Sequence, residues 1–258
     1  MKNYNTLFWL TVFSIAMGYL ETSVVVYLRK IYYPAGFNFP LVPIVPQIAV
    51  TELLREAATI IMLAAISILA GKNKLEKFSF FFYCFAIWDL FYYLFLKILL
   101  AWPVSLLSWD ILFLIPTPWL GPVLAPCLVS ITFIIFTLIV LNAQRLHPET
   151  NFNKTEIFQL IIGGTLIVSS FMYTYLNEVS YTELIGASLL EDVTSYIPKS
   201  YNWFLFILGE LVFIATIVAF AKRNNVIFSE SMLMKAKEYP SIRSLLYSLF
   251  YNSQKKQR

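Results

Sequence analysis

Charged residues are scarce in this sequence. Only 13% of its 258 residues are Asp, Glu, Lys or Arg, whereas soluble domains carry about 25%. Hydrophobic residues make up 59% of the chain, and the mean hydropathy of +0.70 is typical of proteins that have lipid as their solvent. The composition therefore excludes a sizeable soluble domain and predicts an integral membrane protein.

Histidine and cysteine are scarcer still. His147 is the single histidine, which excludes haem or zinc ligation by several histidines. Cys84 and Cys127 fall within apolar segments and lack the spacing of a zinc site or a disulfide framework, so we expect them to be packing residues. The Gly-x-Ser-x-Gly, His-Glu-x-x-His and P-loop patterns are also missing. We therefore expect no metal and no cofactor, and no motif names a catalytic residue.

Six apolar runs dominate what is present, and each is close to the roughly 20 residues that a membrane-spanning helix needs. We predict an all-α integral membrane protein whose six helices form one bundle over 1–223, the first helix being an uncleaved span. A basic tail over 224–258 mixes apolar and basic residues, which favours a place on the membrane surface. The predicted spans are 6–28, 47–70, 78–101, 118–141, 155–176 and 203–221.

The basic residues are distributed unevenly about these spans. Fourteen of the nineteen Lys and Arg residues fall on the side of the N-terminus, and Arg29, Lys30 and Lys199 fall on the opposite side. Because cytoplasmic loops carry the excess of Lys and Arg, we predict that both termini are cytoplasmic, in a membrane of the bacterial inner (plasma) type. Topology and anionic lipid headgroups account for the basic residues, so we expect membrane lipids and no nucleic acid as partners.

Two segments on the predicted outer side are unusual. Residues 31–46 contain no charge and several aromatic and proline residues. Residues 102–118 are apolar, bounded by prolines and too short to span the membrane. The second segment is typical of a re-entrant or interfacial element sheltered by protein. An aromatic belt with prolines in rigid loops is the alternative explanation.

Ionisable residues inside the spans are the candidate functional residues, because charge in a membrane is costly and by default marks function. Glu52, Arg55 and Glu56 follow the i, i+3, i+4 spacing of one helix face. Several polar residues likewise follow one face of the third span, and all the candidates lie at or above the predicted midplane. We predict that they enclose a cavity that opens outward. The candidates are Glu21, Glu52, Arg55, Glu56, Asp89, Tyr92, Tyr93, Lys97, Asp110 and Glu210.

Each of these residues also has a purely structural explanation. Ion pairs between helices can hold a bundle together, Lys97 can reach the outer headgroups with its long side chain, and Asp110 can be solvated in a loop. Gly163 and Gly164 are best explained by a close helix crossing.

Three functions stay open on the sequence. A surplus of carboxylates suits a protein that handles a proton, a cation or a small polar solute in a transport-like way. Paired carboxylates also suit a membrane-embedded enzyme that acts on a lipid or lipid-linked substrate at the outer leaflet by acid–base chemistry. The third possibility is a non-catalytic subunit or assembly factor of a membrane complex. We rank the transport-like function first by a narrow margin.

Overall fold

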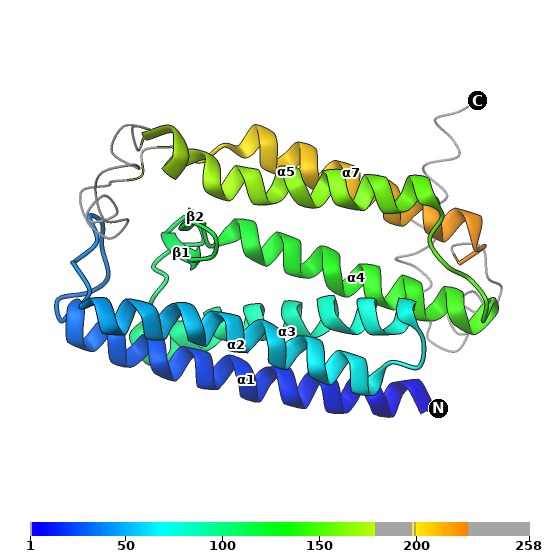
Figure 1. Cartoon of the computed structure of the whole chain (residues 1–258), viewed down its shortest axis with the longest axis horizontal. Coiled ribbons are helices and arrows are strands. Elements are labelled where there is room, and N and C mark those ends of the chain that lie inside the picture. Colours follow the sequence, from blue (N-terminus) through cyan, green and yellow to red (C-terminus); the bar gives the residue numbers. More distant parts are fainter. Residues whose placement is uncertain (1, 179–197, 199, 227–258) are drawn as a thin grey trace, which may run out of the picture.

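The structure is a computed structural model that describes residues 2–178, 198 and 200–226. It is a bundle of long helices with one small hairpin between the third and fourth of them (Figure 1). The cytoplasmic tail predicted over 224–258 lies outside the described residues from position 227 onward. The elements are α1 (Lys2–Tyr32), α2 (Pro46–Ala70), α3 (Lys74–Leu100), β1 (Trp109–Phe113), β2 (Trp119–Pro122), α4 (Leu124–Leu146), α5 (Lys154–Glu178) and α7 (Trp203–Arg223).

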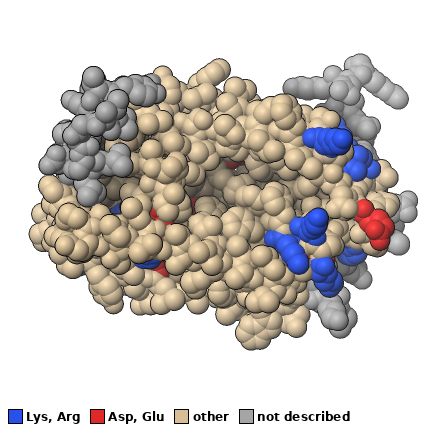
Figure 2. All heavy atoms as spheres, in the orientation of Figure 1, with Lys and Arg blue, Asp and Glu red and all other residues tan. Residues whose placement is uncertain are grey.

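All six described helices are long and apolar enough to cross a membrane, which confirms the predicted membrane bundle. Large apolar side chains are exposed along them, for example Leu69 on α2 and Phe204 on α7, as expected where the surroundings are lipid. The helices run alongside one another, and lysine and arginine gather at one end of the molecule (Figure 2). We call this the basic end; it holds Lys72, Lys74, Lys77, Arg145 and Lys154.

The segment predicted to be re-entrant or interfacial contains no helix. Its second half forms β1, which pairs in antiparallel register with β2, so that Asp110 lies opposite Gly121. The predicted fourth span began at 118, but α4 begins at Leu124. Pro116, Pro118 and Pro122 explain the difference, because a proline disfavours helix in the residue before it and donates no backbone hydrogen bond.

The helices pack in two groups. In the first group α1 and α2 both pack on α3, and in the second α5 packs on α7. Helix α4 lies against α3 and α7, and β2 contacts α5, so α4 and the hairpin are the main connections between the groups.

Glycines allow two of these helix contacts to be close. A Cβ atom added at Gly18 of α1 would lie 3.0 Å from the carbonyl oxygen of Trp88 in α3. On α5 and α7, Gly163 and Gly209 face each other, and a Cβ atom at Gly209 would lie 2.9 Å from the oxygen of Gly163. The close crossing predicted at Gly163 is therefore present. Gly164 differs, because a Cβ atom there would meet no atom within 4 Å.

Candidate functional site

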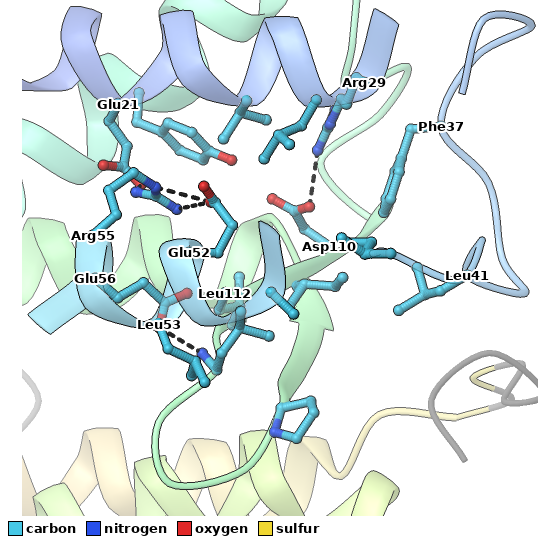
Figure 3. A pocket seen from close by; sticks show the side chains of 18 of the residues that line it. Glu21, Arg29, Phe37, Leu41, Glu52, Leu53, Arg55, Glu56, Asp110 and Leu112 are labelled. Atoms are coloured by element: carbon cyan, nitrogen blue, oxygen red, sulfur yellow. Dashed lines mark hydrogen bonds and ion pairs between the residues drawn. The ribbon is translucent and has the colours of Figure 1, made fainter. Parts of the chain in front are cut away.

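A cavity of about 310 Å³ lies among α1, α2, α3 and the hairpin, at the end of the bundle opposite the basic end (Figure 3). Residues of the segment between α1 and α2 also line it. The close approach of α1 to α3 at Gly18 brings Glu21 of α1 into the same cavity as Asp89 and Tyr92 of α3. Eight of the ten predicted site residues line this cavity: Glu21, Glu52, Arg55, Glu56, Asp89, Tyr92, Tyr93 and Asp110.

Arg55 binds two of the carboxylates. Its Nη2 and Nε atoms donate to Oε2 of Glu52, at 2.7 and 2.9 Å, and its Nη1 atom pairs with Glu21 on α1. Glu52 is one helical turn before Arg55, so the predicted i, i+3 spacing forms a real contact. The guanidinium therefore joins α1 to α2 and gives both acids a cationic partner.

A second ion pair involves an arginine that the sequence analysis assigned only to topology. Arg29 of α1 donates to Oδ1 of Asp110 at 3.0 Å, and the two residues are only 7% and 2% exposed. The Arg29 guanidinium also lies over the rings of Trp102 and Phe37, at 3.8 and 4.3 Å from their centroids, which adds cation–π attraction. Burial raises the pKa of Asp110, and the neighbouring Arg29 opposes that rise.

Glu56 and Asp89 have neutral partners instead. Oε2 of Glu56 accepts a hydrogen bond of 2.9 Å from the backbone N–H of Leu114, just after β1, and Oδ2 of Asp89 accepts one of 2.9 Å from the Ser130 hydroxyl of α4. Within the described ranges, neither carboxylate forms an ion pair. Five carboxylates and two guanidiniums line the cavity, and these two acids are the ones left without a cation.

The remaining two predicted residues lie elsewhere. Lys97 is exposed near the end of α3 and donates to the backbone oxygen of Pro103 at 2.8 Å. Glu210 of α7 is buried and accepts a hydrogen bond of 2.8 Å from Thr132 of α4. Its other oxygen, Oε1, has no hydrogen-bond partner in the part of the chain that the structure describes. Neither side chain is part of the cavity lining.

A second, larger hollow adjoins the cavity. This groove of about 850 Å³ runs between α3 and α5 over α4, and it is lined mostly by aromatic and aliphatic side chains. The face of the molecule in Figure 2 is hollowed near its middle. Trp88, Asp89 and Leu112 line both the cavity and the groove, so the polar space and the apolar space meet at these residues.

The inner side of the cavity is bounded by apolar packing. Trp88 belongs to a buried cluster that continues towards the basic end through Met17, Cys84, Phe80 and Leu10. Between the cavity and the basic end, α1, α2 and α3 therefore enclose a packed apolar core.

The chain matches no protein-family model, no curated protein and no solved structure. Among the described residues, no group of three or more His, Cys, Asp and Glu side chains is arranged to hold a metal ion. The functional argument therefore depends on the geometry of the cavity and the groove.

Proposed function

We propose that this membrane protein binds a cation, or a polar group that carries a proton, in the acidic cavity and handles it in a transport-like way. The observation that carries the proposal is the pair Glu56 and Asp89, two buried carboxylates in one cavity with only neutral hydrogen-bond donors. A buried carboxylate without a counter-charge is stabilised either by a bound cation or by a proton. The excess of Lys and Arg at the opposite end of the bundle supports an extracytoplasmic position for the cavity.

Glu56 and Asp89 also bear on the hypothesis of a non-catalytic subunit. If the charges served only to hold the bundle together, each acid would be expected to have a cationic partner, as Glu21, Glu52 and Asp110 have. Glu56 and Asp89 depart from that pattern. The lipid-enzyme hypothesis keeps one specific observation in its favour, the apolar groove that meets the cavity at Asp89.

The test is flux through the purified protein in proteoliposomes. We expect uptake of protons or of methylammonium, a minimal organic cation, and we expect Glu56→Gln and Asp89→Asn each to lower it at least tenfold. Glu149→Gln is the matched control, since Glu149 is exposed in the loop after α4 and its neutralisation leaves the cavity intact. This variant should keep the wild-type rate.

The absence of flux from folded wild-type protein would contradict transport. In that case, lipid extracts incubated with the protein should be analysed by mass spectrometry for a changed headgroup. A product lost in both cavity variants, but not in Glu149→Gln, would establish the enzyme hypothesis instead.

A further inference from the structure

We infer that the cavity and the groove form one binding site for a membrane lipid whose headgroup carries an ammonium group. The headgroup occupies the acidic cavity, and one acyl chain lies along the groove. This inference rests on the proposal that Glu56 and Asp89 face a cationic group, and it names the class of molecule that carries that group.

The groove has the length and the lining that an acyl chain needs. Its wall on α3 extends from Lys74 to Asp89, which at 1.5 Å per residue is about 22 Å, most of the roughly 30 Å hydrocarbon core of a bilayer. Phe78, Ile157 and Ile161 line it and are 43%, 46% and 61% exposed, so the groove is open to the surroundings along its side. Apolar space that faces lipid tails is occupied by them, because water has no hydrogen-bond partners there.

Gly164 shows that no side chain fills the groove beside α5. The residue lines the groove, and a Cβ atom at this position would meet no atom within 4 Å. Its neighbour Gly163 is packed against α7. The two glycines therefore have different roles, and the second keeps the wall of the groove free of side-chain atoms.

The junction between the two spaces contains a donor without an acceptor. Trp88 lines both spaces and is 7% exposed, and its indole N–H has no hydrogen-bond partner within the described part of the chain. Trp119 lines the groove, and its buried indole N–H also has no hydrogen-bond partner among the described residues. Buried indole N–H groups usually have an acceptor. In a glycerolipid the ester carbonyl oxygens lie between the headgroup and the chains. A lipid with its headgroup in the cavity and one chain in the groove would bring these oxygens near Trp88, which lines both spaces.

The polar end of the site fits a headgroup with both signs of charge. Glu56 and Asp89 supply negative charge without a cation. Arg29 has a buried Nη1 atom that lacks a partner among the residues described, and its guanidinium is a suitable donor to a phosphate oxygen. A volume of about 310 Å³ is within the range of about 300–1,000 Å³ for small-ligand sites. Phosphatidylethanolamine has this chemistry, whereas phosphatidylglycerol lacks the ammonium group.

The experiment is photo-crosslinking of the full chain in detergent micelles, with phosphatidylethanolamine that carries a diazirine in one acyl chain. We expect the labelled peptides to come from α3 and α5 along the groove. Gly164→Phe, which fills the groove, should lower labelling at least tenfold. Leu69→Phe adds the same ring at an exposed position of α2 outside the groove, and this variant should stay within twofold of wild type. If Gly164→Phe fails to fold, Ile161→Trp provides bulk at an exposed position of the same wall.

The headgroup is tested with phosphatidylglycerol carrying the same labelled chain. Wild type should prefer phosphatidylethanolamine at least fivefold, and the double variant Glu56→Gln/Asp89→Asn should lose the preference while retaining label in the groove. Labelling spread over all lipid-facing helices, or unchanged in Gly164→Phe, would overturn the inference. Methylammonium uptake in Gly164→Phe separates the two proposals: uptake without lipid labelling leaves the cation site standing and removes the lipid.

Discussion

At the scale of single residues, the buried Arg29 and the half-buried Arg55 connect the elements around the cavity. Arg55 connects α1 and α2 through Glu21 and Glu52, and Arg29 connects α1 to the hairpin through Asp110. Removing one partner of a buried ion pair costs about 3–5 kcal/mol, because the other partner is left as an uncompensated buried charge. The arginines therefore hold together the elements that enclose the cavity.

The Arg29–Asp110 pair gives a direct prediction about protonation. Burial raises the pKa of Asp110, and Arg29 is the strongest of the groups that oppose the rise, ahead of hydrogen bonds from the Ile111 backbone and the Tyr93 hydroxyl, so removing the guanidinium raises this pKa further. We expect Asp110 to take up a proton at neutral pH in Arg29→Leu. The infrared spectrum of this variant should contain a carboxylic-acid carbonyl band that is missing from wild type.

The double variant Arg29→Leu/Asp110→Asn is the control for that assignment, since it lacks the carboxyl group. A band that persists in the double variant would have to come from another acid and would refute the prediction for Asp110. The double variant should also recover part of the thermal stability lost in Arg29→Leu, because it contains no unpaired charge.

The sequence allowed six of the seven charged residues of the cavity lining to be predicted, because a charge within an apolar run is a conspicuous signal. Arg29 was missed because it lies at the end of a span, where an arginine is equally well explained by topology. Its position eight residues after Glu21, with Val25 between them on the same stripe, was the signal that pointed into the cavity. Lys97 and Glu210 are also charged residues within apolar runs, so the sequence could not distinguish them from the lining residues. Only the packing of the helices shows that they lie outside the cavity.

At the scale of elements, the hairpin is the feature that the sequence analysis did not anticipate. Prolines excluded a helix at its turn, but the pairing of β1 with β2 depends on a surrounding bundle that buries both strands. Asp110 and Leu120 are almost completely buried. A short two-stranded hairpin is marginal by itself, so its existence could not be inferred from local pattern.

Gly209 of α7 and Gly164 of α5 provide a matched prediction at this scale. In Gly209→Ala the new Cβ atom would approach Ile167 and the Gly163 oxygen to 2.8 and 2.9 Å, and we expect a loss of about 1–3 kcal/mol in stability from overpacking. Gly164→Ala meets open space and should gain up to about 1 kcal/mol, because alanine is the better helix former. Thermal unfolding of the two variants in the same detergent measures the difference.

Equal stability of the two variants would contradict the close crossing of α5 and α7 at Gly163 and Gly209. Gly163→Ala is a second check on the same contact, since a Cβ atom there would lie 3.0 Å from the Phe213 ring and 3.1 Å from the Gly209 oxygen.

At the scale of the whole molecule, the separation of the basic end from the acidic cavity follows the expected orientation of a membrane protein. Six candidate spans, an even number, predict that both ends of the described bundle lie on one side of the membrane, and the excess of Lys and Arg predicts that this side is the cytoplasm. The number and type of spans were predictable because hydropathy alone determines them. How the helices pack around the groove was not, since helix contacts depend on small residues and on the inserted hairpin.

Orientation is testable with single cysteines in a Cys84→Ala/Cys127→Ala background. Ser105, before β1, and Glu149, after α4, are both exposed and lie on opposite sides in the predicted topology. A membrane-impermeant maleimide added to intact cells should label Ser105→Cys and should label Glu149→Cys only after lysis. The reverse pattern would place the cavity on the cytoplasmic side.

Helix α4 and the hairpin are the main links between the α1–α3 group and the α5–α7 pair. The lateral pressure of the surrounding lipid tails therefore acts across the groove with few protein contacts to resist it. The width of the groove therefore depends on the surrounding bilayer as well as on contacts within the protein. Solubilisation in a short-chain detergent should alter the groove while leaving the helices intact, so circular dichroism alone is a poor guide to whether a preparation keeps its native shape.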